Sequence, residues 1–265
     1  MASIKGLEWT FDTAASAYDK FRPGYVDELY KMIFDYITLS ESSCAVEVGI
    51  GSGQATLPFL KTGCRLTAVE YGEELSKLCR KKFRDYPNFS VVTNKFENET
   101  FSDSVYDLVY SATAFHWVPE EIGYAKVFSM LKSGGAFARF ANHPYRDKGN
   151  IPLCEEIDRI YAEYYYKYYN KKQEAPMEYS EEQAVKIANI AVKYGFVDIK
   201  HAMFHRTRTF SASEYCTLLG TYSDHIAIEE SIRKEFFSKI ADAINDYGGS
   251  ITVYDTIDLQ LARKP

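Results

Sequence analysis

The segment VEVGIGSGQ, residues 46–54, constrains the fold of this chain more than any other. Three glycines alternate in it, at Gly49, Gly51 and Gly53, between a short apolar run and a segment with a helical pattern. A strand, a glycine-rich turn and a helix form the unit with which a parallel α/β sheet holds a nucleoside or anionic ligand. Glycine tolerates positive φ and lets a ligand approach the backbone. The acid Glu47 would add little to a pyrophosphate site, so the turn indicates a ligand other than a phosphate.

Strand and helix patterns alternate through the first half of the chain. A helix is predicted over residues 25–37, and strands are predicted over residues 44–48, 66–69, 89–93, 106–110 and 136–142. This alternation predicts an α/β fold with a mostly parallel sheet that has helices on both faces. The expected architecture is a three-layer α-β-α, doubly wound sheet of seven strands, with an antiparallel strand at the C-terminus.

The pattern changes after residue 142. The tyrosine-rich run 157–172 has helical spacing, and further elements are predicted as a helix over 181–193, a strand over 197–210, and helices over 211–222 and 228–249. The closing segment, residues 251–264, alternates apolar and polar residues as a half-buried edge or antiparallel strand would. We therefore expect one domain over residues 1–265, with a lid segment over 1–24. A mostly helical substrate-cap insertion over 143–223 would include one sheet strand.

Charge and cysteine usage exclude several classes of partner. The chain has 31 basic and 37 acidic residues, a net charge of −6, and no dense basic stripe, which argues against nucleic acid. The five cysteines are scattered without metal-ligand spacing, so we expect a reduced cytoplasmic protein with no metal site. No apolar run is long enough to span a bilayer, so no membrane partner is expected. Composition leaves the oligomeric state open between monomer and homodimer.

Four segments carry a resemblance to a known family. They are FDTAASAYDKFRPGY, VEVGIGSG, AVEYGEEL and YDLVYSATAFHWV, in this order. They resemble the N-terminal lid, the first motif E/DxGxGxG, the acidic end of the second strand and the fourth strand with its turn in class I S-adenosylmethionine-dependent methyltransferases. The type is that of the methyltransferase type 11 domain, and the most similar branch is that of the trans-aconitate methyltransferases. The resemblance covers nearly the whole chain. It implies S-adenosyl-L-methionine as cofactor, S-adenosyl-L-homocysteine as product and a small-molecule substrate.

The first two motifs indicate how the cofactor would be held. The turn from Gly49 to Gly53 would face the amino acid part of the cofactor, and Glu47 would fix this loop or the ammonium group. Glu70 stands 17 residues after Gly53, at the end of the second strand, where a carboxylate can accept both ribose hydroxyls.

The adenine side of the site follows from the resemblance. It implies that Tyr71 and Leu75 flank the ribose and adenine. Phe96 and Glu97 occupy the position at which members of the family bind the edge of the adenine. Members of the family often carry a small residue here with an acid or serine, so Lys95 is a departure from the pattern.

The turn SATAFHWV carries the candidate catalytic residue. Ala112 and Thr113 lie just past the fourth strand, where ligands of open α/β sheets bind. A His-Trp pair is more often packing than chemistry. At this position, however, Trp117 would line the pocket around the methyl donor. His116 could orient the acceptor or take its proton.

Further residues are candidates for the lid and for the acceptor. Tyr18 and Arg22 would close over the cofactor site, and the paired donors of arginine suit a carboxylate of the cofactor or of the substrate. In the cap insertion, Tyr145, Tyr222 and Ser223 are candidates for binding the acceptor.

The function predicted is methyl transfer to a small molecule, with O-methylation of a carboxylic acid by in-line SN2 displacement as the specific hypothesis. A sulfonium methyl group is already electrophilic, so such an enzyme mainly aligns the reactants and excludes water. An NAD(P)-dependent oxidoreductase is an alternative, because GxGxG overlaps the GxGxxG fingerprint, although Gln54 stands at the sixth position. The other alternative is a non-catalytic nucleoside-binding protein of the same fold.

Overall fold

The computed structural model describes residues 24–265, so Tyr18 and Arg22 lie outside the described residues. The chain divides into two compact units. We call residues 24–142, 179–204 and 257–265 the sheet unit, and residues 143–178 and 205–256 the helical unit. The proposed division into a lid, a domain and a cap insertion stays a prediction.

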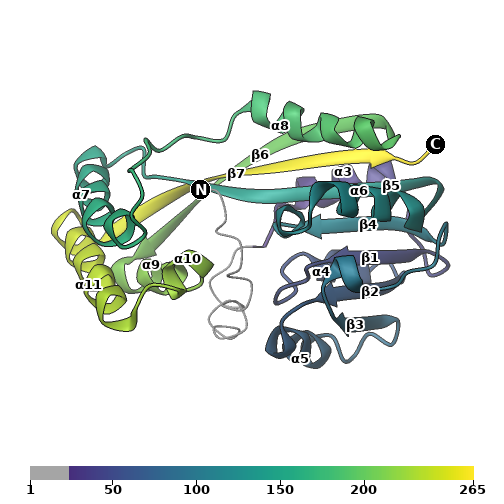
Figure 1. Cartoon of the computed structure of the whole chain (residues 1–265), viewed down its shortest axis with the longest axis horizontal. Helices are drawn as coiled ribbons and strands as arrows, with labels where there is room; N and C mark the ends of the chain where they lie inside the picture. Colours follow the sequence, from purple (N-terminus) through teal and green to yellow (C-terminus); the bar gives the residue numbers. More distant parts are fainter. Residues whose placement is uncertain (1–23) are drawn as a thin grey trace. The chain divides into compact units, whose positions relative to one another are not determined.

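A seven-stranded sheet has the strand order β3-β2-β1-β4-β5-β7-β6. Its strands are β1 (Cys44–Val48), β2 (Arg65–Glu70), β3 (Phe89–Thr93), β4 (Tyr106–Ala112), β5 (Leu131–Tyr145), β6 (Val197–Ser211) and β7 (Ser250–Arg263) (Figure 1). The first five strands pair in parallel, with Val46 of β1 opposite Thr67 of β2 and Val109 of β4. The C-terminal strands are antiparallel. This arrangement confirms the predicted fold class.

Helices cover the sheet within the sheet unit. They are α3 (Asp27–Tyr36), α4 (Thr56–Leu60), α5 (Glu73–Lys82), α6 (Glu120–Met130) and α8 (Glu181–Ala188), with short 3₁₀ segments η1 (Phe96–Asn98), η2 (Phe115–Trp117) and η4 (Asn189–Tyr194). Leu108 and Tyr110 of β4 pack in one apolar core with Ile33 of α3. Val109, between them, packs in a second core with Val127 of α6. Because strand side chains alternate between the two faces, each central strand contributes to both cores.

The helical unit has an apolar core of its own. Its helices are α7 (Ile151–Tyr161), the π-helical segment η3 (Ala162–Tyr166), α9 (Ala212–Leu219), α10 (Ser223–Ile226) and α11 (Glu230–Asp246). Ile157, Tyr165 and Phe236 belong to this core. Ser211 opens α9 with a capping box, accepting from the Glu214 backbone N–H, as its position before a helical pattern predicted.

A buried polar network lies inside this apolar core. His225 is 3% exposed, and its Nδ1 donates to Asp224 Oδ1 at 2.9 Å while its Nε2 lies 2.9 Å from the Tyr161 hydroxyl. Tyr165 donates to Asp224 Oδ2 at 2.7 Å. Burial acts to raise the pKa of Asp224, but the bonds from His225 and Tyr165 hold that pKa well below its usual range. The tyrosines of this segment thus serve the packing and hydrogen bonding of the helical unit.

The structure decides between the two alternatives for the closing strand. β7 is antiparallel but not an edge strand, because it lies between β5 and β6, and β6 forms the edge. Residues 255–262 of β7 are all buried. The helix expected over residues 181–193 ends as α-helix at Ala188 and continues as 3₁₀ turns to Tyr194, before Gly195 with φ of 87°.

Within residues 24–265, no helix is both long and apolar enough to cross a bilayer.

Replacing His225 by phenylalanine should lower the free energy of unfolding by about 3 kcal/mol, because the largely buried Asp224 carboxylate loses a hydrogen-bond donor. Urea unfolding followed by far-UV circular dichroism measures this loss. His201→Phe is the matched control, since this imidazole pairs with Glu181 at an exposed site and its loss should cost less than about 1 kcal/mol. Equal losses in both variants would contradict a structural role of the network.

Candidate cofactor site

The predicted cofactor residues gather at one edge of the sheet. β1 pairs in parallel with both β2 and β4, so the carboxyl ends of these three strands lie side by side. The glycine turn follows β1, Glu70 ends β2, and Thr113 follows β4. The structure therefore brings together the three motifs that the sequence placed far apart.

The glycine turn adopts a backbone that other residues would strain. Gly49, Gly51 and Gly53 have φ of 72°, 58° and 81°. A Cβ at Gly49 would lie 2.4 Å from Cβ of Ala114, and one at Gly53 would lie 2.5 Å from the ring of Phe83. Positive φ and close packing together require glycine at both ends of this turn.

Glu70 connects the glycine turn to the turn after β2. Its Oε2 accepts from the Gly51 N–H at 2.8 Å, and its Oε1 accepts from the Gly72 N–H at 2.9 Å. A carboxylate has about four acceptor positions, so these bonds are compatible with hydroxyls as further partners. The role of Glu70 toward a ribose stays a prediction.

Glu47 is fully buried beside the turn. Its Oε2 accepts from the Thr56 hydroxyl and from the Tyr110 hydroxyl, both at 2.8 Å. Its Oε1 has no hydrogen-bond partner in the part of the chain that the structure describes. Burial raises the pKa of Glu47 to about 8, and the nearby charge of Glu70 acts in the same direction. A pKa in this range favours the protonated form of Glu47 at neutral pH.

The turn after β4 is strained and held by several bonds. Thr113 has φ of 54°, which is unfavourable for a β-branched residue. Its N–H donates to the Phe140 carbonyl at 2.8 Å, and its hydroxyl lies 2.6 Å from the Tyr25 hydroxyl and accepts from the Asn142 N–H at 3.2 Å. The preceding residue, Ala112, is half-buried. Such strain, when the surroundings enforce it, is common at functional sites.

His116 and Trp117 follow this turn in η2. His116 is exposed and Trp117 is half-buried, and their ring centroids lie 5.2 Å apart. An exposed imidazole is accessible to a ligand, and its role in orienting or deprotonating an acceptor stays a prediction.

The residues expected at the adenine lie in two different environments. Tyr71 is 50% exposed, and the Lys95 ammonium lies 5.0 Å from its ring centroid. Leu75 and Phe96 are buried, whereas Glu97 is partly exposed. The exposed ring of Tyr71 is accessible for stacking. Lys95, the departure from the family pattern, thus contacts one of the expected ligand residues.

Lys126 of α6 holds the loop after β3. Its Nζ donates to the carbonyl oxygens of Phe96 at 2.6 Å, of Glu97 at 3.2 Å and of Glu99. The same ammonium lies 5.0 Å from the ring centroid of Phe96. Burial lowers the pKa of Lys126. A single side chain therefore fixes the loop that contains Phe96 and Glu97.

The three predicted acceptor residues all belong to the helical unit. Tyr145 ends β5, and its ring centroid lies 5.6 Å from the Lys148 ammonium. Tyr222 precedes α10 with its ring 5.6 Å from that of His225, and Ser223 is buried at the first position of α10. Their role in binding an acceptor stays a prediction.

Four residues that sequence reasoning did not single out hold these turns, namely Tyr25, Thr56, Tyr110 and Lys126. Tyr110 and Lys126 have a signal in the sequence. Tyr110 is a polar group inside an apolar strand, and Lys126 interrupts the apolar side of a helix. Tyr25 and Thr56 have no comparable signal, because nothing in the local pattern identifies the groups that they bind. Among residues 24–265, no group of His, Cys, Asp or Glu side chains forms a potential metal site.

Glu47→Gln should stabilise the protein increasingly as the pH rises. The folded-state pKa near 8 lies above the unfolded value, so the stability that the proton provides is present below pH 4.5 and is lost as the pH approaches 8. The difference in unfolding free energy between variant and wild type should grow by about 4 kcal/mol from pH 5 to pH 8.5. Urea titrations at several pH values measure it, with exposed Glu121→Gln as the control. A difference that is independent of pH would contradict a protonated Glu47.

Comparisons with known proteins agree with this geometry. Residues 46–138 match the family model of a methyltransferase domain. An uncharacterized methyltransferase of Schizosaccharomyces pombe is 25% identical over 224 residues, which cover 83% of this chain and 82% of that protein.

Two solved structures share the fold. One, from Anaeromyxobacter dehalogenans, is provisionally assigned as a type II methyltransferase. Its TM-score is 0.64 at 19% identity, and the match covers 92% of this chain and 98% of that one. The other is phosphoethanolamine N-methyltransferase 2 of Haemonchus contortus, in complex with phosphomonomethylethanolamine and S-adenosylhomocysteine. Its TM-score is 0.56 at 13% identity, and the match covers 96% of this chain but only 57% of that one. The chain is thus similar to methyltransferases in the sequence of residues 46–138, and it shares the fold of these two solved structures.

Proposed function

We propose that this chain transfers a methyl group from S-adenosyl-L-methionine to a small-molecule acceptor. The specific reaction proposed is O-methylation of a carboxylic acid by in-line displacement. The observation that carries the proposal is the buried Glu47 directly beside the positive-φ glycine turn, at the edge where Glu70 fixes the same turn. The solved structure with S-adenosylhomocysteine supports the choice of cofactor by its fold.

The residues at this edge fit the charges and groups of the proposed cofactor. A turn of glycines offers backbone polar groups without side chains in front of them. Glu47 has one oxygen without a hydrogen-bond partner among the described residues, and a cation beside it would favour its ionised form. Glu70 would accept from hydroxyls. These properties fit an aminoacyl sulfonium nucleoside better than a pyrophosphate.

The chemistry needs alignment more than acid–base catalysis. When bound, S-adenosyl-L-methionine would supply an electrophilic methyl group. The chain would contribute Trp117 as a wall beside the reacting groups and His116 as a residue that orients the acceptor. A carboxylate acceptor is already ionised at neutral pH and needs no base. The site as described has no residue that must act as one.

The choice of a carboxylic acid rests on the sequence. The resemblance to the trans-aconitate branch favours it, and so does Arg22, whose paired donors suit a carboxylate. Arg22 lies outside the described residues.

Calorimetric titration with S-adenosyl-L-methionine and with NADH tests the cofactor. We expect binding of the first and at least about 10-fold weaker binding of the second. Glu70→Ala should weaken binding of S-adenosyl-L-methionine at least about 10-fold, because the glycine turn loses its anchor. Glu74→Ala, at an exposed position on α5, is the control and should bind like the wild type. Release of S-adenosyl-L-homocysteine with a panel of small carboxylic acids tests turnover.

The two alternatives give different results in these assays. Preference for NADH would overturn the proposal in favour of an oxidoreductase. Binding of S-adenosyl-L-methionine without turnover on any metabolite of a broad panel would favour a nucleoside-binding protein. Turnover on amines alone would contradict a carboxylic acid as acceptor, but it would agree with methyltransferase activity.

Lys126→Met should weaken binding of S-adenosyl-L-methionine about 10-fold, because three carbonyl groups of the loop after β3 lose their common donor. Calorimetry measures the change in Kd, and circular dichroism checks that the variant is folded. Lys77→Met is the matched control, since this helical lysine pairs only with exposed acids. Identical affinities in both variants would contradict a positioning role for Lys126.

A further inference from the structure

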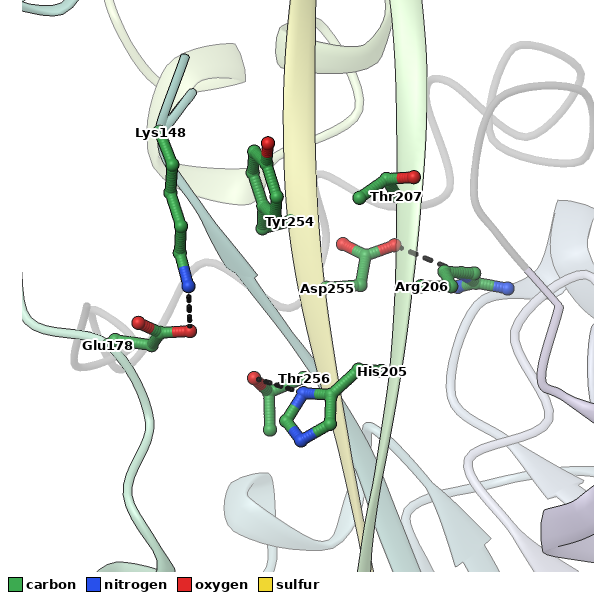
Figure 2. A pocket seen from close by; sticks show the side chains of 8 residues that line it. All are labelled: Lys148, Glu178, His205, Arg206, Thr207, Tyr254, Asp255 and Thr256. Atoms are coloured by element: carbon green, nitrogen blue, oxygen red, sulfur yellow. Dashed lines mark hydrogen bonds and ion pairs between the residues drawn. The ribbon is translucent and has the colours of Figure 1, made fainter. Parts of the chain in front are cut away.

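The polar cavity of the helical unit has lining groups that do not converge. Its volume is about 310 Å³, and its lining includes Lys148, Arg206, Tyr254 and Asp255. Arg206 and Asp255 lie on one face of β6 and β7, whereas Lys148 and Tyr254 lie at the opposite face (Figure 2). These groups therefore cannot bind one ligand together.

The glycine turn, in contrast, is held from α5 by groups that converge on two adjacent peptide units. The Cys79 thiol donates to the Gly51 carbonyl at 3.2 Å. The Lys82 ammonium donates to the next carbonyl, that of Ser52, at 2.9 Å. Cys79 is fully buried, whereas Lys82 is exposed at the last position of α5. Two side chains of one helix thus bind two consecutive carbonyl groups of the turn.

The spacing of these side chains along the chain explains why they reach the same turn. Cys79, Lys82 and Phe83 stand at positions i, i+3 and i+4, which share one face of a helix. The Phe83 ring packs against the turn, since a Cβ at Gly53 would lie 2.5 Å from it. The Lys82 ammonium lies 5.7 Å from the centroid of the same ring. One face at the end of α5 therefore contacts residues 51–53.

Gly51 is bound on two sides. Its N–H donates to Glu70 Oε2 at the end of β2, and its carbonyl accepts from Cys79. Two residues further, the Gly53 N–H donates to the Ile50 carbonyl at 3.0 Å. The turn between β1 and α4 is therefore fixed by its own backbone, by β2 and by α5.

A turn of this composition depends on such bonds. Glycine populates positive and negative φ about equally, so the peptide units next to Gly51 and Gly53 can rotate at little steric cost. Rotation of a peptide unit reverses the directions of its C=O and N–H groups together, because both lie in one rigid plane. The bonds from Cys79 and Lys82 to the two carbonyls oppose this rotation. They therefore favour one arrangement of donors and acceptors along the turn.

The consequence is a turn that is preorganised before a ligand binds. A ligand that requires one arrangement binds with an apparent affinity that is reduced by the fraction of molecules in that arrangement. One hydrogen bond changes such a population by about 3- to 10-fold. A thiol is a weak donor and the Lys82 side chain is exposed, so each bond belongs at the lower end of this range.

We propose that Cys79 and Lys82 are positioning residues of the cofactor site, which hold the backbone of residues 51–53 in the arrangement that binds the ligand. This inference rests on the proposed function, because the ligand at the turn is taken to be S-adenosyl-L-methionine. It assigns the last turn of α5 an effect on affinity that acts through the glycine turn and not through contact with the ligand.

Calorimetric titration of the full chain with S-adenosyl-L-methionine and with S-adenosyl-L-homocysteine tests the effect on affinity. Cys79→Ala and Lys82→Met should each weaken binding of both ligands about 3-fold, and the double variant should weaken it about 10-fold. Cys79→Ser keeps a donor and should bind within about 2-fold of the wild type. Lys81→Met is the matched control, because it removes the same charge at the neighbouring, exposed position of α5.

The two ligands distinguish an effect on the backbone from an effect of charge. The sulfonium group gives S-adenosyl-L-methionine one positive charge more than its product, so a direct effect of the Lys82 charge would change the two affinities by different factors. An effect through the backbone weakens both by the same factor. A change in only one of the two affinities would contradict a positioning role for Lys82.

Hydrogen exchange of the ligand-free protein, followed by mass spectrometry, measures the turn itself. Peptides that cover residues 51–54 should exchange at least about 3-fold faster in Cys79→Ala and in Lys82→Met than in the wild type. Peptides from β4 should exchange at the wild-type rate. Equal acceleration in β4 would indicate a general loss of stability and would contradict a local role.

Two further outcomes would overturn the proposal. They are unchanged exchange at residues 51–54 in both variants, and affinities in both variants equal to that of Lys81→Met. Should Cys79→Ala fail to fold, Lys82→Met decides alone, because its exposed side chain tolerates truncation. A wild-type protein that binds neither ligand would contradict the proposed function, and the exchange rates, which need no ligand, would still decide whether α5 holds the turn.

Discussion

The carboxylate of Glu70 is the contact on which the candidate cofactor site depends. Three of the five residues of the glycine turn are glycines, which have no side chain to fix the backbone and can adopt many other φ angles. Bonds from the Gly51 and Gly72 N–H groups to one carboxylate select a single arrangement of the turns after β1 and β2. The Ser111 hydroxyl donates to the Val48 carbonyl and connects β4 to the same edge. Side chains of β2 and β4 therefore stabilise the glycine turn that follows β1.

The elements around this site could be predicted from the sequence because their signals are local. The glycine turn, the alternation of apolar runs and the Ser cap before α9 each depend on residues within one or two turns of the chain. β7 shows where such signals fail. Its polar residues indicated a solvent-facing side, but Asp255 and Asp258 are buried and paired. Asp258 accepts from the Ala141 N–H and from the Tyr179 hydroxyl. Both aspartates therefore give β7 the alternating apolar and polar sequence of an edge strand, although it lies inside the sheet.

The site could be predicted only in part for a related reason. Motifs name the residues at the strand ends, but the groups that hold them come from other segments. Thr56 and Tyr110 bind Glu47 across 9 and 63 positions of the chain, and Lys126 reaches the loop after β3 across 27 to 30 positions. In the sequence, Lys126 shows only as an interruption of the apolar side of a helix, and this pattern does not identify the carbonyl groups that it binds. Pairwise contacts of this kind become visible only once the topology brings the segments together.

The buried acids of this chain show how their partners decide their charge. Asp224 keeps its negative charge because His225 and Tyr165 donate to it, despite burial. Glu47 has only neutral hydroxyl donors, and burial raises its pKa to about 8. A ligand cation next to Glu47 would reverse this balance, because it favours the ionised carboxylate and drives off the proton. A cationic ligand at the glycine turn would thus bind with release of this proton, whereas an anionic ligand would leave Glu47 protonated.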